Sequence, residues 1–379
     1  MDRRDREPLT RTADSPSLMS FPHSLLEKLP ARTQWFFLIS TSALFALGLH
    51  AAGIPAALLI GPMAAGILTG VNGGTIRVFP KSYLFAQAII GCMIAQVITP
   101  GILVTFLHSW PLFLCVVLST IIASTLLGWL LNRLRVLPGT IGIWGSSPGA
   151  ATAMVVMAEE FGSDARLVAF MQYLRVVCVA LTASVIARFW VDTTGEVHPE
   201  IAWFPHIRWL PFAETLAVAV LGGTAGRLLR IPSGTMLVPL AAGAVLHSLG
   251  IVEIELPEWL LALTYALLGW RIGLNFTRGV LAHASHALPH ILLSIAALFV
   301  FCGGLALLLT RVLGVDPLTA YLATSPGGMD SIAIIAASSN VDVSFVMALQ
   351  AARIFIVVLV GPYLARYVAR HAGDPPVSH

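Results

Sequence analysis

The chain has 379 residues, of which 57% are hydrophobic and only 11% are charged, and its formal net charge is +3. A soluble domain usually carries about 25% charged residues, because its surface faces water. The composition therefore excludes an ordinary soluble protein, and the small net charge does not indicate binding of nucleic acid.

Long apolar segments recur along the chain. Residues 110–131, 168–189 and 291–309 are each long enough to cross a bilayer as a helix, which takes about 20 apolar residues. Strands of a transmembrane barrel would instead alternate in hydropathy over about 10 residues, a pattern that the sequence does not have. We therefore expect an all-α polytopic membrane protein with about 10 transmembrane helices in two five-helix repeats.

Composition divides the chain into five segments. Residues 1–34 are polar and lack the apolar stretch and small-residue cleavage site of a signal peptide, so we expect a disordered cytoplasmic tail. Membrane repeat 1 covers 35–190, and a polar linker covers 191–208. Membrane repeat 2 covers 209–368, and a C-terminal tail covers 369–379.

One motif and its spacing define the two repeats. Ser147-Pro148-Gly149 recurs as Ser325-Pro326-Gly327, an offset of 326 − 148 = 178 residues. Self-similarity of this kind is typical of a tandem duplication. Polar and turn-forming residues coincide at this offset, or at one residue less: Gln172 with Gln350, Arg175 with Arg353, Asp164 with Asp342, Gly91 with Gly269, Ile54-Pro55 with Ile231-Pro232, and Pro62 with Pro239.

The charges between the apolar segments distinguish two architectures. If the Ser-Pro-Gly segment crosses the membrane, each copy has six spans and both copies point the same way. If it enters and returns, each copy has five spans and the second copy is inverted. Lys and Arg are enriched in cytoplasmic loops, and the inverted arrangement places Arg77, Arg133, Arg227 and Arg278 in the cytoplasm and the acidic loop 253–258 outside. We favour inversion, in a cell inner membrane, with both termini cytoplasmic.

The Ser-Pro-Gly segment predicts a re-entrant or broken helix in each copy. Proline removes a backbone donor and glycine adopts unusual conformations, and such a break is tolerated in a bilayer only where protein buries it or where it lines a wet cavity. Serine before proline is typical of a helix N-terminus, with proline at the first helical position. We expect each break to present free N–H groups to an anionic substrate, although a simple proline kink is the alternative. The predicted substrate-binding residues here are Ser147, Pro148, Gly149, Ser325, Pro326, Gly327 and Gly328.

Ionisable side chains inside the apolar segments are the other candidates, because they are costly in a membrane and usually functional. Gln172 and Arg175 share one helix face, as do Gln350 and Arg353, so we expect two inward-facing polar pairs that bind substrate. Asp330 follows the second break directly and has no acidic counterpart in the first copy. We expect it to couple transport to an ion. The alternative for these residues is a network of interhelical pairs that only stabilises the bundle.

No metal or cofactor is expected. The histidines His283, His286 and His290 have a helical spacing, but no Cys or acid lies near them in the sequence. The cysteines have no CxxC spacing and are expected to be buried small hydrophobic residues: Cys92, Cys115, Cys178 and Cys302.

The repeated motifs resemble those of the AbrB-type family of bacterial membrane proteins, whose members were once labelled ammonia monooxygenases. The stretches that carry the resemblance are 59–66, Ser147-Pro148-Gly149 and 325–330. The resemblance covers nearly everything after the N-terminal tail, and it implies internal duplication and a role in regulating gene expression. The inverted repeat with paired breaks is also similar to the citrate/sodium symporter class, by fold analogy alone.

Three functions follow, of which a secondary transporter of a small anionic or zwitterionic metabolite is favoured. A membrane-embedded regulator that acts indirectly on gene expression is the alternative. An ammonia monooxygenase is least favoured, because it needs a metal centre, and we expect no enzymatic activity. The expected partners are the lipid bilayer and a small-molecule substrate, without direct contact to nucleic acid. The sequence is compatible with both a monomer and a homo-oligomer.

Overall fold

The computed structural model describes residues 26–52, 54, 56–96, 110–134, 136–137, 140–147, 154–155, 158–159, 163–191, 207–231, 233–354 and 356–357, without the side chains of 187–191 and Asp330. Within these ranges the chain forms helices and connecting turns, and no strand. The C-terminal tail, most of the linker and residues 1–25 of the predicted N-terminal tail lie outside the described residues. Residues 26–34 of that tail are described, and α1 begins at Ala31, before the predicted end of the tail.

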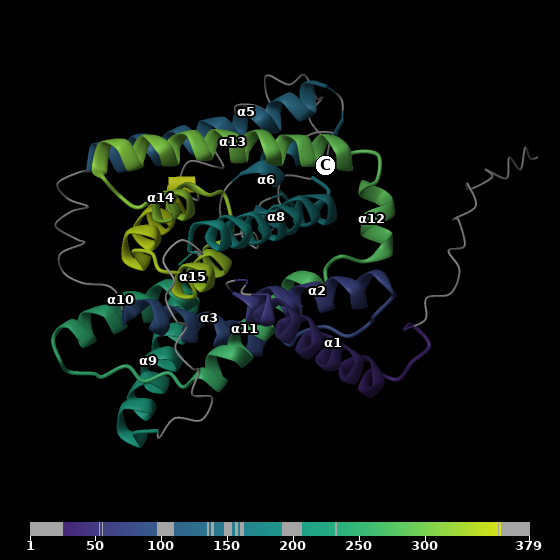
Figure 1. Ribbon diagram of the computed structural model, residues 1–379. Helices are drawn as coiled ribbons and strands as arrows, with labels where there is room; N and C mark the ends of the chain where they lie inside the picture. The colour runs from purple at the N-terminus through teal and green to yellow at the C-terminus, as the bar shows by residue number, and fades with distance from the viewer. Residues whose placement is uncertain are drawn as a thin grey trace, which may run out of the picture.

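The helices pack in two layers, one above the other in Figure 1. The lower layer contains α1 (Ala31–Ala51), α2 (Ala57–Val71), α3 (Pro80–Ala95), α9 (Trp209–Leu228), α10 (Gly234–Ser248) and α11 (Glu258–Gly273). The upper layer contains α5 (Trp110–Arg133), α6 (Ile141–Ser146), α8 (Ala165–Val191), α13 (Leu288–Leu313), α14 (Pro317–Thr324) and α15 (Met329–Ala337). The short helix α12 (Arg278–Ala284) connects the layers, and a further apolar helix, Val343–Ile354, follows α15.

Each layer takes helices from both halves of the chain. The lower layer combines the early helices of the two predicted copies, and the upper layer combines the later ones. Equivalent helices also share local geometry. Ala56 and Ser233, which precede α2 and α10, both adopt the left-handed backbone conformation with φ of 55° and 54°. Pro62 and Pro239 then lie at equivalent places inside those helices.

In the lower layer, α2 and α11 run in the same direction in close contact. A Cβ atom added to Gly269 would lie 2.7 Å from the carbonyl oxygen of Leu59, near the start of α2. One added to Gly70, at the end of α2, would lie 2.8 Å from the carbonyl oxygen of Phe276. Residue numbers therefore rise together along the contact, from Leu59 beside Gly269 to Gly70 beside Phe276, so the last turns of α11 run in the same direction as α2.

The equivalent pair, α3 and α10, also runs in the same direction in close contact. Gly91 in α3 packs against the carbonyl group of Met236, near the start of α10. Further along, a Cβ atom on Gly243 of α10 would lie 2.9 Å from the Cβ atom of Ala95, the last residue of α3. Small residues let these backbones approach, as in other membrane helix pairs.

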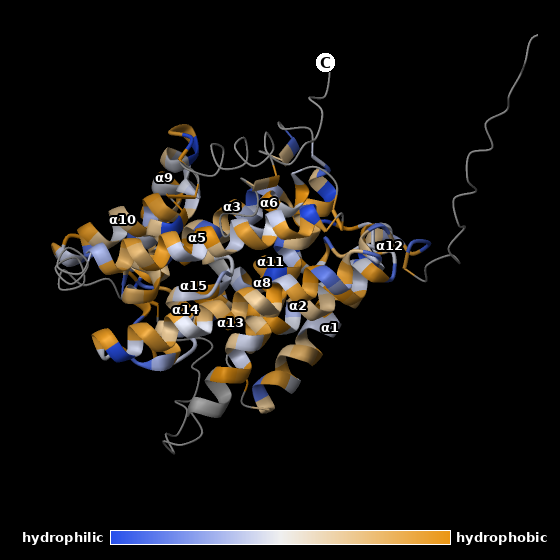
Figure 2. Cartoon of the chain, turned by 90° about the horizontal axis from the view of Figure 1, so that it is seen from above, coloured by the Kyte–Doolittle hydropathy of each residue, from blue (hydrophilic) through white to orange (hydrophobic). Residues whose placement is uncertain are grey.

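The helices are those of a membrane protein. Four are long and apolar enough to cross a bilayer: α1, α5, α13 and the described part of α8, Ala165–Ile186. They confirm the predicted spans 110–131, 168–189 and 291–309. Large apolar side chains also face outward, such as Phe36 in α1 and Val300 in α13, which are 73% and 78% exposed. Figure 2 shows hydrophobic residues along helices throughout the molecule. A surface of this kind is stable in hydrocarbon rather than in water.

The cysteine prediction is correct in part. Cys92 and Cys302 are buried, Cys178 is half-buried, and all four thiols are free. Cys115 is exposed on α5, so the expectation of burial was wrong for this residue. A lipid-facing position accepts a small apolar residue as readily as a protein core does.

Candidate functional site: two helix breaks, each bound to a buried arginine

The second Ser-Pro-Gly segment interrupts a helix, as predicted. Helix α14 ends at Thr324 and α15 begins only at Met329. Ser325 and Gly328, at the two ends of the gap, have ψ angles of 138° and 135° and are therefore extended. The break is buried from Ser325, which has no exposed surface, to Gly327, and Gly328 is half-buried.

The first copy has the same helix end. Helix α6 ends at Ser146, and Ser147 follows with a ψ angle of 125°. The next two predicted site residues, Pro148 and Gly149, lie outside the described residues. At the first break, the structure therefore describes only the C-terminal end of α6 and Ser147.

The two serine hydroxyls bond backward, contrary to the predicted N-cap. The Ser147 hydroxyl donates to the carbonyl oxygen of Ile143 at 2.8 Å, and the Ser325 hydroxyl donates to that of Leu322 at 3.0 Å. Gly328, rather than a serine, precedes α15, so the expectation that Pro326 opens the helix was wrong. The physical reason is that a serine hydroxyl readily donates to a carbonyl oxygen three or four residues earlier in the preceding helix, and the two glycines extend the gap beyond the proline.

In the first copy, the predicted polar pair binds the carbonyl groups at the end of α6. The Gln172 side-chain amide donates to the carbonyl oxygens of Trp144 at 2.7 Å and Ser147 at 3.0 Å. The Arg175 Nη1 donates to those of Ser146 at 2.8 Å and Ser147 at 3.0 Å. Arg175 Nη2 also donates to Gln172 Oε1 at 2.6 Å, which joins the pair.

The second copy repeats this arrangement at the end of α14. The Gln350 side-chain amide donates to the carbonyl oxygens of Leu322 at 2.8 Å and Ser325 at 3.2 Å. Arg353 Nη1 donates to Ser325 at 2.7 Å, and its Nη2 donates to Gly327 at 3.1 Å and to Gln350 Oε1. The sequence offset therefore identified two sites with similar hydrogen bonds, which differ in one acceptor: the carbonyl oxygen of Ser146 in the first copy and that of Gly327 in the second.

These contacts explain how two arginines are held inside the protein. Arg175 and Arg353 are each 2% exposed, and a buried charge is costly unless it is paired and hydrogen-bonded. The C-terminal end of a helix carries roughly half a negative charge on its unpaired carbonyl groups, which partly offsets each guanidinium. Among the described side chains, no carboxylate bonds to either arginine, and the Nε atom of each has no partner. Two of the five N–H groups of each guanidinium therefore have no acceptor among the described residues.

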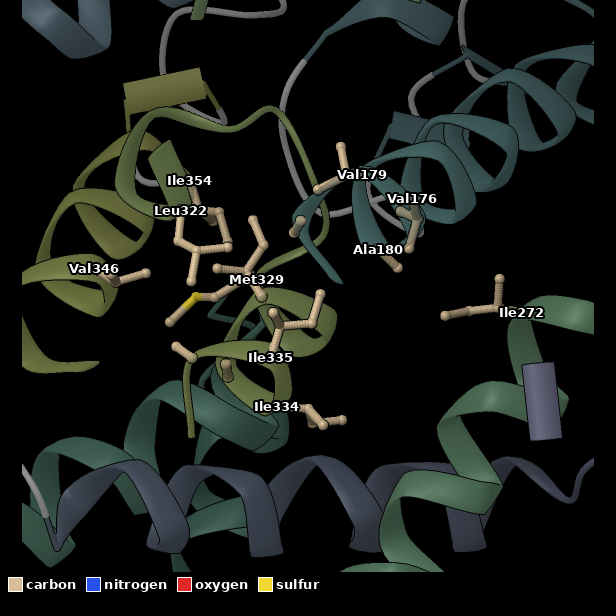
Figure 3. Close-up of a cluster of buried hydrophobic side chains, with 14 of the residues drawn as sticks. Val176, Val179, Ala180, Ile272, Leu322, Met329, Ile334, Ile335, Val346 and Ile354 are labelled. Atoms are coloured by element: carbon tan, nitrogen blue, oxygen red, sulfur yellow. The ribbon is translucent and has the colours of Figure 1, made fainter. Parts of the chain in front are cut away.

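The two sites are adjacent. A Cβ atom on Gly327 would lie 2.8 Å from Val179, and one on Gly328 would lie 3.4 Å from Val176, so the second break packs on α8. Figure 3 shows Val176 and Val179 on this helix, near the start of α15 at Met329. Because Val176 is next to Arg175 in the sequence, the second break lies beside the arginine of the first copy. The two guanidinium groups act on one another electrostatically.

A small cavity touches the first site. Its volume is about 10 Å³, and Leu127, Ser146, Met171, Arg175 and Ser294 are part of its wall. This volume has room for about one water molecule. A metabolite does not fit in a cavity of this size.

Asp330 is the second residue of α15, at the site where it was predicted. Its neighbours Met329 and Ser331 are 3% and 2% exposed, so the backbone here is buried. The carboxylate itself lies outside the described side chains, and its role as coupling residue stays a prediction.

The remaining candidates lie away from the breaks. Arg271 is half-buried, with its guanidinium 5.6 Å from the ring centroid of Tyr83. His283 is 3.3 Å from Asp164, which caps α8 by accepting from the amide of Arg166 at 2.9 Å. The described residues contain no group of three His, Cys, Asp or Glu side chains close enough to hold a metal.

Sequence reasoning missed the main-chain half of the site. The carbonyl oxygens of Trp144, Ser146 and Leu322 are direct partners of the Gln–Arg pairs. Main-chain oxygens have no signature in the sequence. The available signal was the equal spacing between each pair and its break in both copies.

Comparisons with known proteins place the whole chain in one family. The family model described as "Transition state regulatory protein AbrB" matches residues 24–369. The chain is 50% identical over 340 residues to "Putative regulator AbrB" of Escherichia coli (strain K12), covering 89% of this chain and 97% of that protein. It is 24% identical over 366 residues to "Uncharacterized protein YhjN" of Bacillus subtilis (strain 168), covering 90% and 94% respectively. The chain therefore belongs to the AbrB family of proteins.

Proposed function

We propose that this protein is a secondary transporter that moves a small anionic or zwitterionic metabolite across the inner membrane, coupled to an ion. The observation that carries the proposal is the pair of buried helix breaks, each bound to a buried arginine. Discontinuous helices at the interface of two repeats are typical of substrate and ion sites in secondary transporters. The protein is proposed to act without enzymatic activity, cofactor or metal.

The two copies are proposed to be inverted, with five spans each and about 10 in total. The direction of the lower-layer helices supports this. Consecutive spans in one copy run in opposite directions. If both copies pointed the same way, the second helix of one copy would therefore run against the third helix of the other. Instead α2 runs with α11 and α3 runs with α10, as inversion requires.

A contact between the copies supports the proposed orientation. Arg278, at the start of α12, donates from Nε to the carbonyl oxygen of Val71 at 2.6 Å. This contact brings the end of α2 and the end of α11 to the same side, as inversion requires, and we propose that this side is cytoplasmic. The pairing of Arg208 with Glu253 and Glu255, at 2.7 and 3.0 Å, would then lie outside.

The chemistry of the breaks favours an anionic substrate group. Each guanidinium keeps two N–H donors that the described residues do not use, and its charge is only partly offset by the helix end. A carboxylate or phosphate accepts such donors in pairs. We propose that the substrate binds there once the layers separate enough to enlarge the cavity, with Gln172, Arg175, Gln350, Arg353 and the two breaks as its contacts. Asp330 is proposed to carry the coupling ion.

The alternative is a membrane-embedded regulator that acts on gene expression indirectly. It is favoured by the name of the Escherichia coli relative, "Putative regulator AbrB". Moving or sensing a metabolite would give such an effect without contact to nucleic acid. The two functions share the same ligand site and differ in whether the ligand crosses the membrane.

The proposal is tested by finding a ligand and removing an arginine. Purified protein in detergent is screened with metabolites, since a ligand at 100 times its Kd stabilises a folded protein by about 2.7 kcal/mol. Arg353→Ala is expected to abolish both the thermal shift and uptake while the protein still inserts in the membrane. Arg311→Ala, at an exposed place near the end of α13, is the matched control and should keep both.

Arg353→Lys separates a lost ligand contact from a lost fold. Lysine keeps the charge but not the paired donors, so this variant is expected to fold and to bind the ligand more weakly. Unchanged uptake in both Arg353→Ala and Arg353→Lys would contradict the proposed site.

A further inference from the structure

Each arginine fills a cradle of uncharged oxygen atoms. Around Arg175 the cradle consists of the carbonyl oxygens of Ser146 and Ser147 and the side-chain oxygen of Gln172. All three oxygens accept from the two terminal nitrogens of the guanidinium. They lie at the C-terminal end of a helix, where the backbone carries partial negative charge.

The second cradle has the same composition. Arg353 donates to the carbonyl oxygens of Ser325 and Gly327 and to the side-chain oxygen of Gln350. Gln350 is fixed in turn, because its amide group donates to the carbonyl oxygen of Leu322 at 2.8 Å. The oxygen atoms are thus held in place by contacts other than those with the arginine.

Oxygen cradles of this kind have a known chemical preference. Unwound backbone carbonyls at the ends of half-helices are the groups that coordinate Na⁺ in secondary transporters, and hard cations take carbonyl and amide oxygens as ligands. Here a guanidinium occupies the position. A metal ion placed about 4 Å from that charge would bind on the order of a thousandfold more weakly, by Coulomb repulsion at an effective dielectric constant of about 20.

We propose that Arg175 and Arg353 are tethered cations, each filling an oxygen cradle at the end of a broken helix that would otherwise bind a monovalent metal ion such as Na⁺. Besides their proposed contact with substrate, the arginines hold the two breaks in place, since they partly neutralise the helix ends as a bound metal ion would. One consequence rests on the proposed transport function: the coupling ion binds elsewhere than in these cradles.

The test removes the tethered charge and asks whether a metal ion replaces it. Arg353→Met keeps much of the length of the side chain and removes the guanidinium. Thermal stability is measured in NaCl and in choline chloride at equal ionic strength. Wild-type protein is expected to melt at the same temperature in both salts. Arg353→Met is expected to melt several degrees higher in NaCl, with saturation as the salt is raised.

Matched variants define the origin of the effect. Arg353→Lys retains a cation and should show no preference for Na⁺. Adding Gln350→Leu to Arg353→Met removes one cradle oxygen and should abolish the response. Arg311→Met, near the end of α13, should behave as wild type. Arg175→Met is expected to acquire its own response at the first cradle.

Two results would overturn the inference. One is a folded Arg353→Met protein with equal stability in all alkali chlorides and in choline chloride. The other is a saturable, Na⁺-specific stabilisation of the wild-type protein that Gln350→Leu removes. If neither methionine variant folds in any salt, the wild-type measurement decides alone, and equal melting in both salts supports the inference. Absence of transport in every assay would count against the proposed function and would leave these stability results standing.

Discussion

Arg175 and Arg353 are buried among neutral oxygens rather than beside carboxylates. Their charges are tolerated because each guanidinium donates to backbone carbonyl oxygens at the C-terminal end of a helix and to a glutamine side-chain oxygen. The glutamines are as important to this arrangement as the arginines, since each both donates to the helix end and accepts from the guanidinium. Gln172 and Gln350 have no exposed surface, so water does not substitute for them.

Removing either glutamine is therefore expected to destabilise the protein. Gln350→Leu leaves buried carbonyl groups and an arginine N–H without partners, and each such group costs about 1–3 kcal/mol. Gln172→Leu should have an effect of similar size, because its contacts are equivalent. Thermal melting in detergent measures the change, with Thr224→Val on the exposed face of α9 as the control, expected within about 0.5 kcal/mol of wild type. Wild-type stability in both glutamine variants would contradict this stabilising role, and a loss in only one of them would contradict the equivalence of the sites.

The sequence predicted the side chains of the two sites but not their backbone partners. Gln172, Arg175, Gln350 and Arg353 could be predicted because polar residues are scarce in so apolar a chain and coincide at one offset. Their partners are backbone carbonyls, and any residue type supplies a carbonyl. The serines before the prolines were assigned to the start of the following helix, whereas their hydroxyls donate to carbonyl oxygens of the preceding helix. A serine hydroxyl can make either contact, so the sequence alone does not distinguish them.

Among the elements, close glycine contacts decide which helices pair. Gly269 in α11 touches the backbone of α2, whereas Gly303 in α13 has open space where a Cβ atom would lie. The two positions are both in helices, so the intrinsic effect of alanine is the same at each. Their difference isolates the packing contribution.

Gly269→Ala is expected to lower stability by about 1–3 kcal/mol, because a Cβ atom would meet fixed backbone atoms of Leu59 and Met63. Gly303→Ala should be neutral or stabilising by up to about 1 kcal/mol, the helix preference of alanine over glycine. Thermal melting compares the two variants. Equal effects would show that the α2–α11 contact does not constrain the fold.

The sequence predicted where the helix is interrupted, but it did not predict at which residue the next helix begins. Ser325-Pro326-Gly327 predicted an interruption, and α14 and α15 are separated there. The start of α15 at Met329 depends on Gly328 and on packing against α8, which is distant in the sequence. Local patterns predict where a helix cannot continue, whereas tertiary contacts determine where the next one starts.

The whole molecule interleaves the two halves of the chain. Duplication and apolar spans could be read from the sequence, because they depend on composition and offset. The layering could not, since nothing in one sequence tells that α2 packs on α11 or that α5 packs on α13. Nor could the packing of the second break on α8, which places the break bound by Arg353 beside Arg175.

Inversion predicts opposite sides for two exposed loops. In a variant with Cys115 and the other native cysteines replaced, Glu253→Cys is expected to react with a membrane-impermeant thiol reagent added to whole cells. Gly279→Cys, in the exposed part of α12, should react only after the membrane is made permeable. Labelling of both from the same side would contradict the inverted arrangement.

Uptake by purified protein in sealed lipid vesicles tests the central claim most directly. The ligand found by thermal shift is added outside, and its accumulation is followed under an imposed proton or Na⁺ gradient. We predict gradient-dependent accumulation above the equilibrium level by wild-type protein and by Arg311→Ala, and none by Arg353→Ala. Tight binding of the ligand by wild-type protein, without any entry into the vesicles, would contradict transport and would favour a membrane-embedded sensor.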